Sequence, residues 1–321
     1  MGITSEEELI QELQQVSFQP VFILGLHRSG TSILYKMLVA TGTVNPVTAY
    51  HVIMYNELLV NHHQGTEDQV KQHLTQLFVE KGQQDRGIDR LKLTADFAEE
   101  YGFLLNRKTL RMSLGRKNVA LFTEMCKKIQ RIAGNDRPIL LKNPYDFSNF
   151  LCIKQMFPHA RFIFIHRHPL KTISSTLNAV KMLLQQKNPY TTLLSHSYDM
   201  LYSNPLIRYP LRFIFCTIPE CGVVLLTGIT TMATSYYMRN IDKLPQEDYV
   251  SISYEELCLH PTETLETIMK KLSLPPGVNI DTSTLMKPRA TEVNSSVKKF
   301  QKQMYRLMKQ YWERFHYTID E

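Results

Sequence analysis

The chain lacks the cysteine pattern of a metal site. Its five cysteines form neither two close pairs nor a pair with nearby histidines, which are the arrangements that bind zinc. The closest pair, Cys216 and Cys221, has no second pair to complete it. We therefore expect reduced, buried thiols in a cytoplasmic protein, namely Cys126, Cys152, Cys216, Cys221 and Cys258.

Targeting and membrane signals are also scarce. Residues 5–13 lack the basic and apolar regions of a signal peptide and instead predict an acidic helix that begins after Ser5. The uncharged stretch at residues 221–238 contains several threonines and two tyrosines, so it is less apolar than most membrane spans. We favour a buried helix there over a span. A further alternative is a surface that contacts lipid or a hydrophobic substrate, which would allow peripheral membrane contact.

Long runs of basic residues are missing, although the chain is basic overall. The formal net charge is +7 and the isoelectric point is near 9.0, yet the basic residues are scattered. Such a distribution favours a small polyanionic partner such as a nucleotide over a nucleic acid. Nothing in the sequence predicts an oligomeric state.

The length of 321 residues and the 43% hydrophobic content suit one large α/β domain with insertions better than two complete domains. We expect the α/β core over residues 19–65 and 136–275, and mainly helical insertions over 66–135 and 188–240. A basic C-terminal helix should lie within residues 294–321.

Short apolar runs predict the strands of a mainly parallel sheet flanked by helices, of the P-loop kind. Four of these runs are residues 21–24, 137–141, 161–165 and 248–252, and residues 43–50 form either a further strand or an extended loop. In such folds ligands bind at the carboxyl ends of the strands, and the helical insertions would cap the acceptor side of that edge.

A glycine-framed loop is the most informative stretch. The apolar run at residues 21–24 leads into a turn at 25–30 and an amphipathic helix at 31–40. The spacing matches the P-loop of nucleoside triphosphatases except that Thr31 replaces the lysine that those enzymes use. This replacement argues against a magnesium-dependent ATP hydrolase.

The same loop can still hold a phosphate. Backbone N–H groups of residues 29–32 would point at the anion from the positive end of the helix dipole. Arg28 adds a cation that could reach a group being transferred. Three hydroxyls supply further donors, those of Ser29, Thr31 and Ser32.

The segment from His27 to Ser32 resembles the loop by which sulfotransferases hold the 5′-phosphosulfate of 3′-phosphoadenosine 5′-phosphosulfate. The resemblance covers roughly residues 20–275 and implies a donor-binding role for the residues of this loop: His27, Arg28, Ser29, Gly30, Thr31 and Ser32.

A second signature follows the run at residues 161–165. Arg167 would lie at the strand tip, Pro169 suits the first turn of a helix, and Ser175 comes eight residues after the arginine. This step is similar to the arginine and serine with which sulfotransferases hold the 3′-phosphate of the donor. A guanidinium fork and a hydroxyl are suitable donors for phosphate oxygens. The Arg-Lys-Gly donor element of cytosolic sulfotransferases is not evident.

Lys142 ends the strand predicted at residues 137–141, where its side chain would point into the ligand crevice. This stretch is also similar to sulfotransferases, which commonly carry a lysine and a small polar residue after the strand. Pro144, however, stands where the cytosolic subgroup has its catalytic histidine. His51 is therefore our candidate for the base, because its near-neutral pKa suits proton transfer. Glu57 is the nearest carboxylate alternative.

The resemblance implies transfer of a sulfuryl group from 3′-phosphoadenosine 5′-phosphosulfate to an acceptor hydroxyl, without a metal. Arg28 and Lys142 would stabilise the transferring group, and His51 would accept the proton. Aromatic and aliphatic residues at 190–238 suggest a hydrophobic, lipid-like alcohol as acceptor. Two alternatives are another P-loop enzyme, such as a small-molecule kinase, and a nucleotide-binding relative without catalysis.

Overall fold

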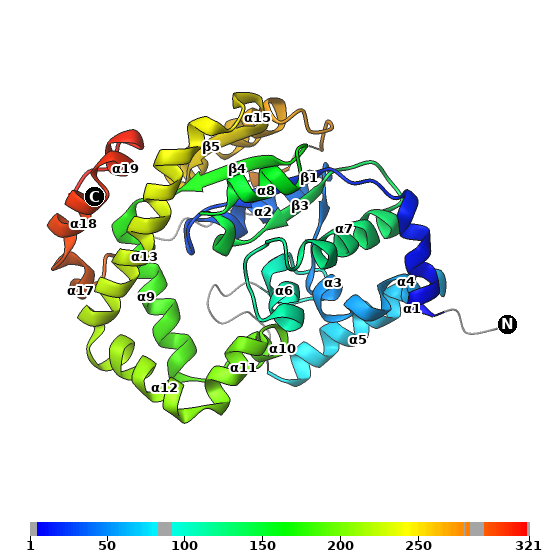
Figure 1. Cartoon of the computed structure of the whole chain (residues 1–321), viewed down its shortest axis with the longest axis horizontal. Coiled ribbons are helices and arrows are strands. Elements are labelled where there is room, and N and C mark those ends of the chain that lie inside the picture. Colours follow the sequence, from blue (N-terminus) through cyan, green and yellow to red (C-terminus); the bar gives the residue numbers. More distant parts are fainter. Residues whose placement is uncertain (1–4, 83–91, 279, 283–291, 320–321) are drawn as a thin grey trace.

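The computed structural model describes residues 5–82, 92–278, 280–282 and 292–319. Five parallel strands form one sheet in the order β2-β3-β1-β4-β5 (Figure 1). The predicted α/β fold with a parallel, helix-flanked sheet is confirmed. The strands are β1 Pro20–Leu24, β2 Asn45–Pro46, β3 Ile139–Lys142, β4 Arg161–His166 and β5 Tyr249–Ser253.

The central strand β1 is buried along its whole length, as its uninterrupted apolar sequence predicts. Phe22 and Leu24 point into a large core on one face of the sheet, and Val21 and Ile23 point into a smaller core on the other. Helices must therefore cover both faces. Because β1 pairs with β3 on one side and β4 on the other, the segments that follow these three strands meet at one edge.

Helices make up most of the remaining described chain (Figure 1). In the first half they are α1 Glu6–Ile10, α2 Thr31–Ala40, α3 Ala49–Ile53, α4 Leu58–His63, α5 Glu67–Glu80, α6 Tyr101–Thr109, α7 Val119–Ala133 and α8 Phe150–Met156. In the second half they are α9 Pro169–Gln185, α10 Pro189–Leu194, α11 His196–Ser203, α12 Pro205–Arg212, α13 Pro219–Asn240, α14 Tyr254–Leu259, α15 Pro261–Lys271, α17 Ser295–Lys298, α18 Gln301–Leu307 and α19 Lys309–Arg314.

Several helix starts agree with the sequence. Ser5 caps α1 in a capping box, Pro169 occupies the first turn of α9, and Asn294 caps α17. The predicted single C-terminal helix, however, is three short helices, α17 to α19. Residues 43–50, expected as a strand or an extended loop, contain only the two-residue strand β2, because Thr48 caps α3 immediately afterwards.

Helix α13 is buried on one side only, which corrects the expectation of a buried helix. Val223, Leu226 and Tyr237 belong to the large core, whereas Val224 and Met232 are 53% and 66% exposed. By length and composition, Pro219–Lys243 is the one helix in the described part of the chain that could cross a membrane, and 39% of its apolar window is buried.

Candidate functional site

The phosphate loop, Lys142 and the second signature lie together at the carboxyl edge of the sheet. Residues 25–30 follow β1, Lys142 is the last residue of β3, and Arg167 directly follows β4. These three strands are adjacent and parallel, so their ends converge. The structure thus brings together the residues that the sequence singled out for donor binding.

The loop has the backbone geometry that an anion site needs. Gly30 caps α2 with a φ of 101° and has no side chain, so the first N–H groups of α2 have no side-chain cap. A Cβ at Gly30 would lie 2.3 Å from the ring of Tyr254, which explains the glycine. Arg28 has a φ of 68°, an uncommon left-handed conformation for a residue with a side chain.

Hydrogen bonds join the two sulfotransferase-like motifs. The Nε of Arg28 donates to the Oγ of Ser175 at 3.1 Å, and the guanidinium of Arg167 donates to the carbonyl of Arg28 at 3.0 Å. The Arg167 guanidinium also lies 4.4 Å from the ring centroid of Tyr254. Two side chains predicted to bind phosphate therefore also shape the loop that surrounds it.

Lys142 is completely buried and extends toward the loop. Its Nζ donates to the Oγ of Ser32 at 3.1 Å and lies 3.5 Å from a carboxylate oxygen of Glu100. Thr31, in the place of the P-loop lysine, is buried at the first position of α2. The neighbouring strand therefore supplies the lysine that the loop itself lacks.

Ser29 gives a test of whether the loop fits a phosphate-bearing donor. Its side chain is completely buried, and its Oγ has no hydrogen-bond partner among the described residues. A buried hydroxyl without a partner is costly, and a phosphate oxygen would satisfy it. Together with the N–H groups of α2 and the nearby cations, this hydroxyl fits an anionic group held by the loop.

Two buried carboxylates at this edge, Glu99 and Glu100, were not among the predicted residues. The segment that carries them pairs with the region after β2, through a bridge between Thr48 and Ala98. The hydroxyl of Tyr190 donates to Glu99 at 2.7 Å. Neither residue lies in a periodic pattern, so only the long-range pairing reveals them.

His51 occupies a capping box at the start of α3. Its Nδ1 accepts the N–H of Thr48 at 3.1 Å, and its own N–H bonds the hydroxyl of Thr48. Burial, helped by the nearby positive charge of Lys71, lowers the pKa of His51 to about 3. The imidazole is therefore neutral at pH 7 and a weak base. Glu57, the other base considered, is exposed at the start of α4.

An aromatic side chain adjoins the loop beside His27. The ring of Tyr145, which follows β3, meets the imidazole of His27 edge-on with centroids 4.6 Å apart. Tyr145 is 46% exposed, so it offers apolar surface beside the phosphate loop.

The next residue, Asp146, is buried. Its carboxylate accepts hydrogen bonds from Tyr101 and Asn143, and burial raises the pKa of this carboxyl to about 6.

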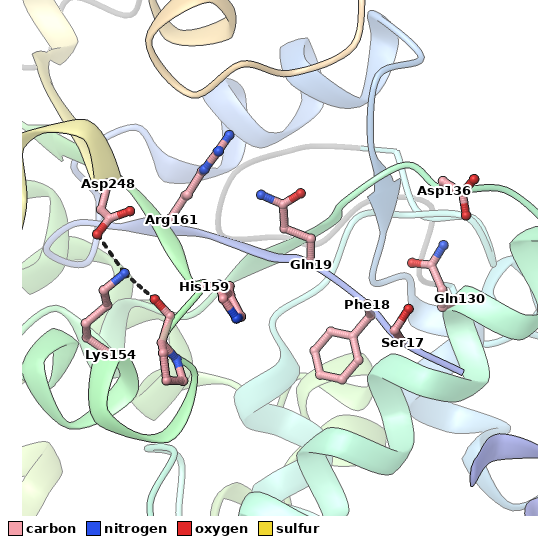
Figure 2. A pocket seen from close by; sticks show the side chains of 10 residues that line it. Ser17, Phe18, Gln19, Gln130, Asp136, Lys154, His159, Arg161 and Asp248 are labelled. Carbon is pink, nitrogen blue, oxygen red and sulfur yellow. Dashed lines mark hydrogen bonds and ion pairs between the residues drawn. The ribbon is translucent and has the colours of Figure 1, made fainter. Parts of the chain in front are cut away.

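A cavity of about 510 Å³ lies at the opposite edge of the sheet (Figure 2). Gln19, Arg161 and Asp248, which line it, stand at the amino ends of β1, β4 and β5. Within it Lys154 is paired with Asp248 at 2.7 Å and with the carbonyl of Pro158 (Figure 2). None of the predicted donor-binding residues lines this cavity.

Comparison with known families agrees with the geometry of the carboxyl edge. The model of the sulfotransferase family matches residues 20–208, which include the phosphate loop, Lys142 and Arg167. The chain belongs to the sulfotransferase family. The matched range of this sulfotransferase ends within α12, so α13 and the helices after it lie outside the match.

Solved sulfotransferases share its fold. The crystal structure of STF9 from Mycobacterium avium superimposes with a TM-score of 0.65 at 14% identity, over 98% of this chain and 82% of that one. STF1 from Mycobacterium tuberculosis gives a TM-score of 0.57 at 15% identity, over 93% and 78%. A sequence search among curated proteins gives no match. At these identities the likeness establishes the fold and leaves the acceptor to be argued from the site.

Proposed function

We propose that this sulfotransferase moves the sulfuryl group of 3′-phosphoadenosine 5′-phosphosulfate to the hydroxyl of a hydrophobic acceptor. The observation that supports the donor is the contact between the two motifs, in which Arg28 bonds Ser175 and Arg167 bonds the backbone of Arg28. One motif suits the 5′-phosphosulfate and the other the 3′-phosphate, so a single bisphosphate could engage both.

In this proposal the loop N–H groups and the hydroxyls of Ser29, Thr31 and Ser32 hold the 5′ end of the donor. Arg167 and Ser175 hold the 3′-phosphate, where a planar guanidinium can bond two oxygens at once. The bound donor supplies the sulfuryl group. The hydroxyl of Ser29, buried without a partner in the described chain, gains one when the donor binds.

Arg28 and Lys142 would stabilise negative charge that develops during transfer. Lys142 is fixed by Ser32 and Glu100 inside a buried site, where a preorganised cation is worth more than in water. Transfer of this kind resembles phosphoryl transfer, in which catalysis comes mainly from positioning and electrostatics. The proposal needs no metal ion.

The acceptor hydroxyl must lose a proton, and we assign its removal to Glu100. Its carboxylate lies beside Lys142, and residue 100 is 8% exposed at the start of α6. His51, the base expected from the sequence, has its Nδ1 engaged with Thr48 and a pKa lowered to about 3. An engaged, buried imidazole that resists protonation is a poor proton acceptor, which disfavours His51.

Single-turnover rates of Glu100→Gln, His51→Gln and Glu57→Gln separate these assignments. We expect Glu100→Gln to slow transfer by about a hundredfold or more. The other two variants should stay close to the wild-type rate. A slow His51→Gln beside an active Glu100→Gln would return the role to His51.

The preference for a hydrophobic acceptor is supported by Tyr145, whose half-exposed ring adjoins His27. Aromatic rings of this kind line sites for apolar ligands. The test is an assay with sulfur-labelled donor against long-chain alcohols, sterols, phenols and sugars. Labelled product from apolar alcohols supports the proposal. Labelling of sugars alone would overturn the acceptor class, and donor binding without turnover would favour the non-catalytic alternative.

A further inference from the structure

Helices α9 and α13 extend from the sheet to α12, which lies at the lower edge of the molecule (Figure 1). A short π-helical segment, η4 Phe213–Thr217, joins α12 to α13. The first turns of α9 carry Ser175 of the candidate site, whereas its other end lies toward α12 (Figure 1). The surface of α12 and η4 is therefore well separated from the phosphate loop.

Apolar side chains are exposed along one stripe of this surface. Leu206, Tyr209, Pro210 and Phe213 stand at positions i, i+3, i+4 and i+7, the spacing of one helix face. Leu206 is 85% exposed, and Tyr209 and Phe213 are 57% and 54% exposed. Such a cluster of large exposed apolar groups marks an interaction surface. We call Leu206, Ile207, Tyr209, Phe213 and Ile218 the apolar tip.

The segment that carries the apolar tip has charges of one sign only. Arg208 and Arg212 are the only charged residues between positions 200 and 219. The Arg208 guanidinium lies 5.0 Å from the ring centroid of Tyr209 and donates to the carbonyl of Tyr202. Glu220, the nearest acidic residue that follows, is paired with Lys299 at 2.7 Å.

The exposed side of α13 continues this character. Val224, Leu225, Ile229 and Met232 are each about half exposed or more, and no charged residue occurs from position 221 to 238. The opposite side of α13 is fixed in the core, where Tyr237 stacks on Phe147 with ring centroids 5.6 Å apart. Because one side of α13 is packed in the core, the helix is better suited to lie against a membrane surface than to span the membrane.

We propose that the apolar tip inserts into the surface of a membrane that contains anionic lipids. Leu206, Phe213 and Ile218 would enter the acyl boundary, with Arg208 and Arg212 at the headgroups. Tyrosine is common at this depth. A second copy of the chain is a poorer occupant. A two-fold interface would bring the arginines of both copies together with no acidic residue of the tip to neutralise them.

Co-sedimentation with vesicles tests this directly. The full chain is mixed with vesicles of phosphatidylcholine alone or of phosphatidylcholine with phosphatidylglycerol. The variants are Leu206→Ser with Phe213→Ser, Arg212→Gln, and a control in which Leu259→Ser and Leu307→Ser remove two exposed leucines elsewhere, 75% and 50% exposed. All these side chains are half exposed or more except Arg212, so the variants should fold; circular dichroism and analytical ultracentrifugation check folding and oligomeric state.

We expect the wild type and the control to bind the anionic vesicles. The double variant Leu206→Ser with Phe213→Ser should bind them at least about tenfold more weakly. Arg212→Gln should weaken binding to anionic vesicles only, as added salt does. Equal binding by the double variant, or no binding by the wild type to either vesicle, would overturn the proposal. A wild-type dimer that the double variant dissociates, without vesicle binding, would assign the tip to a second copy.

Discussion

Arg28 combines a structural and a proposed chemical role in one residue. Its backbone is in the left-handed region, its carbonyl accepts a bond from Arg167, and its side chain bonds Ser175. Backbone strain of this kind persists where the surrounding structure enforces it, often at functional sites. The loop therefore holds a guanidinium at a fixed place between the two motifs.

Replacing Arg28 tests its role in transfer. We expect Arg28→Ala to lower the single-turnover rate by about a hundredfold or more, the range for loss of one preorganised charge-stabilising donor. Arg28→Lys keeps the charge but not the fork, so it should restore the rate only in part. An Arg28→Ala enzyme with the wild-type rate would remove Arg28 from the chemistry.

His51 makes a prediction about acid stability that is independent of catalysis. Its pKa in the folded protein, about 3, is below the ordinary value near 6.5, so the stability that it contributes is present above pH 6.5. That stability is lost as the pH falls toward 3, because the unfolded chain binds the proton first. By pH 5 the loss from this group should be about 2 kcal/mol.

His51→Gln is the matched variant, since glutamine also completes a capping box but does not titrate. Urea unfolding at pH 7 and pH 5 should show a larger drop in the free energy of unfolding for the wild type than for His51→Gln. The same drop in both proteins would show that the buried imidazole does not govern this acid sensitivity.

At the scale of elements, the C-terminal helices support the segment that presents Arg167. The neighbouring His166 forms a hydrogen bond of 2.9 Å between its Nδ1 and the hydroxyl of Tyr311. Its ring stacks on that of Phe315 with centroids 3.9 Å apart. His168 bonds the carbonyl of Thr318 at 2.8 Å through Nε2. Both residues that flank Arg167 in the sequence are thus held by the last described part of the chain.

Phe315→Ala tests this support. Removing a ring that packs on His166 should lower the free energy of unfolding by about 3 kcal/mol and weaken binding of 3′-phosphoadenosine 5′-phosphate. Leu307→Ala on α18, at a side chain 50% exposed, should cost about 0.5 kcal/mol or less. The single tryptophan, Trp312, reports unfolding by fluorescence in both variants. Equal stability of the two would refute the supporting role.

Sequence reasoning recovers the elements whose signals are local. The apolar run before the loop, the proline after Arg167 and the lysine that ends β3 each predict a place at the sheet edge that the structure confirms. His51 also carries a local signal, because Thr48 precedes it by three residues, which is the spacing of a capping box. Hydropathy alone could not show that α13 is buried on one side only.

Glu99 and Glu100 show where such reasoning fails. Glu100 lies beside Lys142 in a segment that pairs with the chain fifty residues earlier, and no local pattern marks either carboxylate. The C-terminal segment is a similar case, since its aromatic residues meet β4 only in the tertiary fold. Residues that a site gains through long-range packing are the ones that a single sequence does not reveal.

At the scale of the whole molecule, two features lie apart from each other. The parallel sheet gathers three cations, the phosphate loop and two buried carboxylates at its carboxyl edge. The apolar tip lies along α12 and η4 at the lower edge of the molecule, where a membrane surface would contact the protein (Figure 1). The proposed donor site is supported by the hydrogen bonds that join the two motifs at this edge.

The most direct test is calorimetric titration with 3′-phosphoadenosine 5′-phosphate and, separately, with magnesium-ATP. It compares the wild type, Arg167→Ala and Arg137→Ala, a control arginine exposed before β3. We predict that the bisphosphate binds more tightly than ATP, and that Arg167→Ala weakens it about tenfold or more while Arg137→Ala does not. Tighter binding of ATP, or unchanged bisphosphate binding by Arg167→Ala, would contradict the proposed donor site.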